Sequence, residues 1–150
     1  MAESRNFKEL LLALNDFTVE YLIVGGYAVM RYSEPRFTKD LDIWVGTSAE
    51  NSRRVFAALA RFGAPLHHDG VTEETFSADQ IVYQIGVPPV RVDILTSISG
   101  CVFQDAWGRR VPGVMYGVPV HFISLPDLIV NKRAAGRTSD LEHLELLGGE

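Results

Sequence analysis

The stretch RFTKDLDIWV, residues 36–45, constrains the fold of this chain most strongly, because polar and apolar side chains alternate along it. Such alternation is typical of a β-strand with one buried face. Its apolar residues would face the core, and Asp40 and Asp42 would share the opposite face with Cα atoms about 6.6 Å apart. Two carboxylates at that spacing can hold one divalent cation or share a pair. A solvated edge strand that carries acids would show the same alternation.

A glycine pair precedes this strand. Apolar residues 21–24 predict a short strand, which runs into Gly25 and Gly26 before a helix-like stretch. Glycines at such a turn let the backbone approach a ligand closely, and the N–H groups at a helix start point towards an anion. The sequence therefore predicts a phosphate-binding turn followed by a strand that holds a metal ion.

The string GGYAVMRYSEPRFTKDLDIWV, residues 25–45, resembles the polymerase-β-like nucleotidyltransferase superfamily, in which a Gly-Gly or Gly-Ser turn opens a helix and an Asp-x-Asp strand follows. It is most similar to a small bacterial branch with a glycine pair, a helix and an Arg-x-Thr-x-Asp-x-Asp strand. The resemblance is strong between residues 20 and 46 and weak elsewhere. It implies an α/β (α+β) fold with a central mixed β-sheet, flanking helices and a C-terminal helix pair.

Length and composition limit the number of domains and the kinds of partner that we expect for this protein. A chain of 150 residues, 47% of them hydrophobic, predicts one domain over residues 1–150 with a proper core. The net charge of −5 makes a large nucleic-acid substrate unfavourable. The single cysteine, Cys101, excludes an intramolecular disulfide and agrees with a cytoplasmic protein. No signal-peptide pattern and no apolar run of about eighteen residues occurs, so we expect no membrane association.

Helical and strand patterns alternate along the chain. Ser4 or Asn6 would cap the first helix, and Thr47 or Ser48 would cap a helix that stops at Gly63. Besides the strand over 36–45, we expect helices over 7–17, 27–32, 48–62, 99–107, 124–135 and 138–147, a strand over 21–24, hairpins 81–86/90–95 and 110–116/118–123, and a polar loop over 64–79.

A third carboxylate lies in the stretch VRVDIL, residues 90–95. If Val92 and Ile94 face the core, Asp93 faces the other way, as Asp40 and Asp42 do, and the three would converge on adjacent strands. Three such acids suit two Mg²⁺ ions about 3.5 to 4 Å apart in a phosphoryl-transfer site. An ion pair of Asp93 with Arg91 or Arg36 is the alternative.

The resemblance implies roles for these acids. Asp40 and Asp42 would bind the metal ion on a nucleoside triphosphate, and Asp93 would bridge a second metal ion and help to activate an acceptor hydroxyl. The expected cofactor is Mg²⁺ or Mn²⁺, and the expected substrate is ATP or another NTP.

Further residues are candidates for nucleotide binding. Arg36 can grip a phosphate in a fork, whereas Thr38 shares a strand face with Asp40 and could position it. Surface pairing with the acids is the simpler account of Arg36. The resembling branch often ends in a lysine, arginine and aspartate pattern, which suggests Lys132 as a triphosphate contact. The helix macrodipole explains cations near a helix C-terminus equally well.

Two departures from the superfamily pattern bear on catalysis. Gly26 stands where a serine often donates its hydroxyl to phosphate, and thirteen residues separate Gly26 from Asp40, a longer gap than in minimal members.

The resemblance implies a metal-dependent nucleotidyltransferase. It would move a nucleoside monophosphate from an NTP, with ATP expected, to a hydroxyl on a small molecule or a partner protein, and release pyrophosphate. A toxin–antitoxin role is one setting for such an activity. The alternative is a catalytically weak or inactive module, for example antitoxin-like, that binds a nucleotide or a partner. A Ca²⁺-stabilised structural domain needs more oxygen ligands than three aspartates provide.

Overall fold

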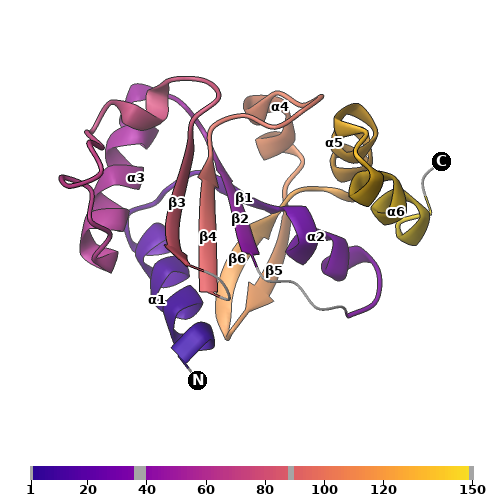
Figure 1. Ribbon diagram of the computed structural model, residues 1–150, viewed down its shortest axis with the longest axis horizontal. Coiled ribbons are helices and arrows are strands. Elements are labelled where there is room, and N and C mark those ends of the chain that lie inside the picture. The colour runs from indigo at the N-terminus through magenta and orange to yellow at the C-terminus, as the bar shows by residue number, and fades with distance from the viewer. Residues whose placement is uncertain (1, 36–39, 88–89, 149–150) are drawn as a thin grey trace.

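The computed structural model describes residues 2–35, 40–87 and 90–148 (Figure 1). Its elements are α1 (Ala2–Asp16), β1 (Tyr21–Val24), α2 (Gly25–Tyr32), β2 (Asp40–Val45), α3 (Ala49–Phe62), the 3₁₀ turn η1 (Thr75–Ser77), β3 (Val82–Val87), β4 (Val90–Leu95), α4 (Phe103–Gly108), β5 (Val111–Met115), β6 (Val118–Phe122), α5 (Leu125–Ala135) and α6 (Thr138–Leu146). The strands form one six-stranded mixed sheet in the order β3-β4-β2-β1-β6-β5. The expected α/β class with a mixed sheet and flanking helices is confirmed.

The centre of the sheet is a run of buried apolar strands. All four residues of β1 are buried, and β1 pairs antiparallel with β2, with Ile23 opposite Ile43. On the other side β1 pairs in parallel with β6. A strand buried on both faces reads as a continuous apolar run, which explains why YLIV lacks the alternation seen in β2.

The other neighbour of β2 is β4, which runs parallel to it. Parallel neighbours need a crossover connection, and here the chain passes through α3, η1 and β3 before it returns. The Ser48 hydroxyl caps α3 by accepting a hydrogen bond from the Asn51 N–H, and Gly63 ends the helix in the left-handed region at φ +100°. This crossover brings Asp40–Val45 beside Val90–Leu95 although the two strands lie far apart in the sequence.

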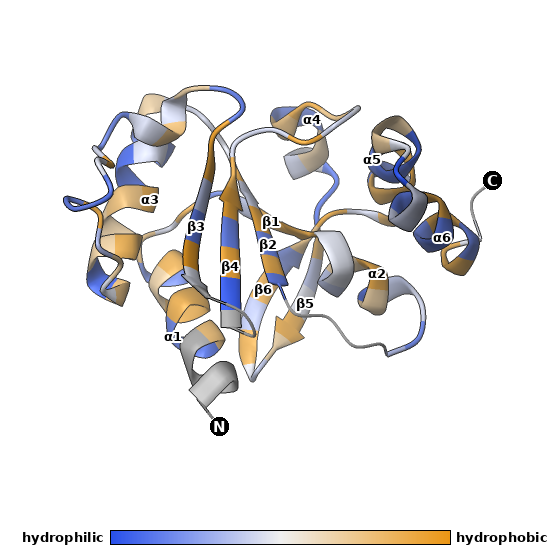
Figure 2. Cartoon of the chain, viewed as in Figure 1, coloured by the Kyte–Doolittle hydropathy of each residue, from blue (hydrophilic) through white to orange (hydrophobic). Residues whose placement is uncertain are grey.

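The two faces of β2 have different environments. Leu41, Ile43 and Val45 are fully buried, as the alternation predicts. In Figure 1, α1 and α3 lie to one side of the sheet, and α2, α5 and α6 lie to the other. On the acid-bearing face Trp44 is also buried, because Phe103 of α4 packs against it edge-on with ring centroids 5.1 Å apart. Figure 2 shows hydrophilic residues interrupting the apolar strands β2 and β4. The acids therefore occupy the part of this face beyond the Trp44–Phe103 contact.

The C-terminal helix pair is present as expected. Ser124 caps α5 with its hydroxyl, which accepts a hydrogen bond from the Asp127 N–H, and Gly136 ends the helix at φ +65°. Thr138 is the first residue of α6. The turn at Gly136 folds α6 back against α5, so residues from both helices reach the same side of the molecule.

Three helix starts differ from the expectation. Helix α1 begins at Ala2, so Ser4 and Asn6 lie within it instead of capping it, and α4 begins at Phe103, after a longer loop. Helix α2 begins at Gly25, two residues before the expected start at Tyr27. Gly25 has φ +67°, a conformation that glycine adopts without steric cost, so the chain can turn directly from Val24 into the helix. Across the three described ranges, no helix is both long and apolar enough to cross a membrane.

Candidate active site

Four charged side chains occupy one patch of the β2–β4 ladder. The parallel register sets Asp42 opposite Asp93 and Asp40 opposite Arg91. Neighbouring strands lie about 4.8 Å apart, and residues opposite each other in a parallel ladder point to the same face. The predicted arrangement of acids on one face of adjacent strands is therefore what the register produces.

Arg91 lies between two of the three acids. Its Nη2 is 2.8 Å from Asp40 Oδ2 and 3.2 Å from Asp93 Oδ2, and its Nε is 3.2 Å from Asp93 Oδ1. The ion pair of Asp93 with Arg91, which the sequence leaves open, is thus present. The Nε–Oδ1 contact is close enough for an ion pair but not aligned as a hydrogen bond, so buried Asp93 Oδ1 accepts no hydrogen bond from the described residues.

Asp42 differs from its neighbours. It makes no ion pair within the described part of the chain, although it faces Asp93 across the ladder. Burial raises the pKa of Asp42 to about 7, with further contributions from the charges of Asp93 and Asp40, while Lys132 and Arg91 oppose the rise. A buried carboxylate with this environment favours a cation or a proton beside it.

Gly25 contacts Asp42 directly. A Cβ atom added at Gly25 would lie 2.3 Å from Asp42 Oδ2, and the φ of +67° disfavours any other residue. The first glycine of the pair therefore lets the start of α2 approach the carboxylate. Gly25 lines the neighbouring cleft, and Gly26 is not among the residues that line it. Of the two predicted glycines, the cleft is bordered by the first.

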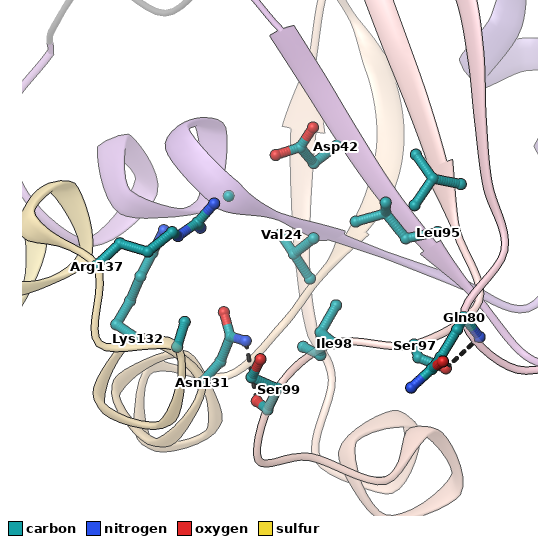
Figure 3. A pocket seen from close by; sticks show the side chains of 13 residues that line it. Val24, Asp42, Gln80, Leu95, Ser97, Ile98, Ser99, Asn131, Lys132 and Arg137 are labelled. Atoms are coloured by element: carbon teal, nitrogen blue, oxygen red, sulfur yellow. Dashed lines mark hydrogen bonds between the residues drawn. The ribbon is translucent and has the colours of Figure 1, made fainter.

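A cleft of about 550 Å³ opens beside Asp42 (Figure 3). Its walls come from the C-terminal end of β1, the start of α2, the β2 and β4 strands, the loop after β4, and the helix pair α5–α6. Lys132 and Arg137 extend into it from the helix pair, as Figure 3 shows. Ordinary ligand pockets have volumes between about 300 and 1,000 Å³, so this cleft can accommodate a nucleotide.

A second carboxylate orders the two cations. Asp140, only 1% exposed, lies 3.2 Å from Lys132 Nζ and 2.7 Å from Arg137 Nε. These two partners hold the pKa of Asp140 at about 2 despite its burial. Lys132 is itself 5% exposed, so Asp140 compensates a buried ammonium and fixes Arg137 at the mouth of the cleft.

The far end of the cleft carries neutral polar groups, which sequence reasoning missed. Gln80 has φ +61°, and its backbone N–H donates a hydrogen bond to the Ser97 hydroxyl. Asn131 donates its side-chain N–H to the Ser99 carbonyl. Figure 3 shows Gln80 and Ser97 at the end away from Arg137, and Asn131 and Ser99 between the two ends. No periodic pattern distinguishes such loop residues from solvated ones, so the sequence offered no signal for them.

The predicted site residues thus separate into three groups. Asp40, Asp42 and Asp93 lie together on β2 and β4. Gly25 and Lys132 border the adjoining cleft. Arg36 and Thr38 lie outside the described residues, and their role stays a prediction.

The donor set can be tested for a metal ion. The unneutralised carboxylate of Asp42, next to Asp93, provides the hard oxygen donors that Mg²⁺ or Mn²⁺ prefers. Among the residues that the structure describes, however, no group of three or more His, Cys, Asp or Glu side chains converges to hold a metal. The Arg91 guanidinium lies between the carboxylates of Asp40 and Asp93, at the position where these two acids would have to meet to share a metal ion. The residues therefore fit a cation at Asp42, but not three carboxylates closing around one point.

Two solved structures share this fold. An inferred nucleotidyltransferase, TM1012 from Thermotoga maritima, matches with a TM-score of 0.62 and 15% identity over 94% of this chain and 89% of that one. The antibiotic-resistance factor ANT(2'')-Ia matches with a TM-score of 0.60 and 16% identity over 97% of this chain and 82% of that one. At such low identity these likenesses establish the fold alone.

Two sequence comparisons complete the assignment. A Mycolicibacterium gilvum (strain PYR-GCK) protein named uroporphyrinogen decarboxylase is 35% identical over 120 residues, which is 75% of this chain and 32% of that protein. The chain spans about a third of the length of this curated relative, so the relative's name describes a much longer protein. The family model described as "Nucleotidyltransferase of unknown function (DUF6036)" matches residues 5–146. With a nucleotidyltransferase fold and a match over nearly its whole length, this chain belongs to the DUF6036 family of nucleotidyltransferases.

Proposed function

We propose that this protein is a metal-dependent nucleotidyltransferase, which transfers a nucleoside monophosphate from an NTP, with ATP as the expected donor, to a hydroxyl on a small molecule or a protein. The observation that supports it best is the position of Asp42. This partly buried carboxylate lacks an ion-pair partner among the described residues and borders a cleft into which Lys132 and Arg137 extend. An anionic ligand with a bound cation would suit this cleft, because its cation would pair with Asp42 and its anionic groups would pair with Lys132 and Arg137.

The triphosphate would bind at the cationic end of the cleft. Lys132 and Arg137 are held in place by Asp140, so little side-chain freedom is lost when phosphate oxygens replace water. The nucleoside would extend towards Gln80 and Ser97, whose neutral donors and acceptors suit a base and a ribose. This orientation sets the α-phosphate beside the β2–β4 acids.

The reaction would proceed by in-line displacement at the α-phosphorus. The acceptor's hydroxyl oxygen forms the new P–O bond, the bond from that phosphorus to the oxygen bridging to the β-phosphate breaks, and pyrophosphate leaves. The hydroxyl proton would pass to Asp93, whose Oδ1 has a free lone pair among the described contacts. Lys132 and Arg137 would stabilise the charge that develops on pyrophosphate.

A divalent cation would complete the site. Asp42 would hold it, with Asp93 as its neighbour across the ladder and Gly25 leaving room for the carboxylate. Mg²⁺ or Mn²⁺, when bound, neutralises phosphate charge and orients the triphosphate. The burial and repulsion that raise the pKa of Asp42 would be relieved by this cation.

Thermal unfolding with ligands tests the proposal without knowledge of the acceptor. Mg²⁺ and ATP at about one hundred times the dissociation constant should add roughly 2.7 kcal/mol to the free energy of unfolding. For a domain of this size the melting midpoint should then rise by about 5 to 10 °C. Asp42→Asn should abolish most of this rise, and the exposed control Glu50→Gln on α3 should preserve it.

Transfer of label from ATP labelled at the α-phosphate, in the presence of Mg²⁺ and candidate acceptors, tests the chemistry itself. Asp42→Asn should lower the transfer by about 10³-fold, since metal-assisted charge stabilisation contributes several kcal/mol. Transfer that survives in this variant would contradict the role of Asp42. A wild-type protein whose melting midpoint does not respond to any nucleotide with Mg²⁺ or Mn²⁺ would contradict the proposal as a whole.

One observation favours a second candidate, a catalytically weak or inactive module that binds a nucleotide or a partner. Arg91 already forms ion pairs with Asp40 and Asp93, two of the three acids that a two-metal mechanism would use. An antitoxin-like protein would fit this description. It predicts a thermal shift with nucleotide but no label transfer to any acceptor, with Asp42→Asn leaving the partner's affinity unchanged.

A further inference from the structure

We infer that Arg91 takes the place of one divalent cation in the carboxylate site, so that the site holds a single metal ion, at Asp42. The inference rests on the proposed function, because it concerns the same acids. It departs from the two-metal arrangement that the acid pattern of the sequence predicts. Arg91 would be a positioning residue, which acts by fixing Asp40 and Asp93.

The geometry of the guanidinium supports this. A carboxylate that bridges two metal ions must offer an oxygen to each, but both Asp93 oxygens lie 3.2 Å from Arg91 nitrogens. The same Nη2 also contacts Asp40 Oδ2 at 2.8 Å. A planar fork that joins two carboxylates in this way occupies the position that a bridging cation would otherwise take.

Burial makes the arrangement difficult to displace. The side chains of Arg91 and Asp93 are 28% and 12% exposed. A second metal ion would have to separate them and leave a guanidinium, which stays charged at any physiological pH, without its carboxylates. The strand register holds Arg91 in place, since it lies opposite Asp40 on β2 and two residues before Asp93 on β4.

Asp42 is the acid that this arrangement leaves available. It lies two residue pairs along the ladder from the Asp40–Arg91 pair, on the same face of the sheet, and makes no ion pair within the described ranges. One divalent cation and one guanidinium together carry three positive charges, equal to the charge of the three carboxylates. Counting the ion pairs of the described residues alone, the metal-free acids carry two uncompensated negative charges, which one divalent cation beside Asp42 would balance.

Counting bound Mn²⁺ tests the inference without any enzymatic assay. Free Mn²⁺ is measured by electron paramagnetic resonance while Mn²⁺ alone is titrated into the full chain. The wild type should bind one ion per chain at the site. Arg91→Met should bind two ions, with the spin coupling of a pair about 4 Å apart, and should bind the first at least about threefold more tightly. Arg91→Lys, which keeps a positive charge, should bind one ion.

Three results would overturn the inference. The first is a spin-coupled Mn²⁺ pair in the wild type, a measurement that depends on no variant folding. The second is a folded Arg91→Met protein that still binds one ion. The third is an Arg91→Met protein that binds Mn²⁺ less tightly than the wild type, which would make Arg91 an organiser of metal ligands. Failure of the proposed function differs from all of these, because the wild type would then bind no Mn²⁺ at all.

Discussion

Two clusters of acids and bases among the described residues, one on α5–α6 and one on β2–β4, are balanced differently. On α5–α6, one carboxylate, Asp140, has two cationic partners, Lys132 and Arg137. On β2–β4, the guanidinium of Arg91 pairs with two carboxylates, Asp40 and Asp93, and the third, Asp42, has no ion-pair partner among the described residues. The pKa of Asp140 is accordingly lowered to about 2, whereas that of Asp42 is raised to about 7.

The comparison separates burial from function. Asp140 is almost fully buried and has the lowered pKa, whereas Asp42 is only partly buried and has the raised one, so burial alone does not predict the direction in which the pKa moves. The direction depends on the contacts: Asp140 accepts hydrogen bonds from Lys132 and Arg137, which lower its pKa, whereas the nearby charges of Asp93 and Asp40 raise the pKa of Asp42. The helix cluster is complete without a ligand and stabilises the fold, while the strand cluster has an excess of negative charge that a ligand cation can neutralise. Three substitutions test this contrast, in order of decreasing expected effect.

Asp140→Ala should have the largest effect on stability. It leaves the buried ammonium of Lys132 without its carboxylate, and breaking one partner of such a pair costs about 3 kcal/mol or more. The melting midpoint should fall by about 6 to 12 °C in a thermal scan. The control is Glu50→Ala, which breaks the exposed pair of Glu50 with Arg54 on α3 and should change the free energy of unfolding by less than about 0.5 kcal/mol. Equal effects of the two substitutions would mean that the helix cluster contributes no more than a surface pair.

Gly25→Ala should have an intermediate effect. Its Cβ would meet Asp42 Oδ2 at 2.3 Å and would also be strained at φ +67°, so we expect a loss of about 2 kcal/mol and a weaker thermal shift with Mg²⁺ and ATP. Gly117→Ala is the control, because it has φ +77° and its Cβ would meet nothing within 4 Å. It should show the strain alone, about 1 kcal/mol, and a full ligand shift. A normal ligand shift in Gly25→Ala would show that the close approach to Asp42 is unimportant.

Asp42→Asn should have the smallest effect, and its effect should depend on pH. A carboxyl group whose folded pKa is raised favours the folded state at low pH, and that contribution is lost as pH rises from about 4 to about 7. In metal-free buffer the variant should match the wild type near pH 4 and be more stable above pH 7.5. The rise in pKa from 3.8 to about 7 corresponds to about 4 kcal/mol, and the cost of burying the Asn amide without a hydrogen bond should reduce the net gain to roughly 1 to 2 kcal/mol. Chemical denaturation at the two pH values measures this, with Glu50→Gln as a control that should show no such pH-dependent gain. A variant less stable than the wild type at pH 8 would assign Asp42 a structural partner.

Much of this arrangement could be predicted from the sequence because the signals are local. Alternation in β2 predicted the shared face of Asp40 and Asp42, and the cap Ser124 with the stop at Gly136 predicted α5. The prediction that Asp93 lies on the same face as Asp42 needed one further assumption, that their strands are neighbours. The pairing of β2 with β4 confirms that assumption.

Other features depend on long-range pairing that no local pattern encodes. The sequence offered Arg91 only as one of two alternative partners for Asp93, and the choice depended on Arg91 lying opposite Asp40. Asp140 belonged only to the lysine, arginine and aspartate pattern that the resemblance suggested, and its pairing with Lys132 depends on α6 packing against α5. Gln80 and Ser97 reach the cleft through loops, where spacing carries no information.

The parallel pairing of β2 with β4 also has a consequence for the order of folding. Each β-hairpin can form from neighbouring segments, whereas β2 meets β4 only after the intervening crossover has been closed. Pairing across such a sequence separation is slow and comes late. The mutual repulsion of Asp42 and Asp93 is therefore absent from the early, locally folded states and arises when β4 docks. We expect the acids to slow this docking step and to leave the hairpins' own formation unaffected.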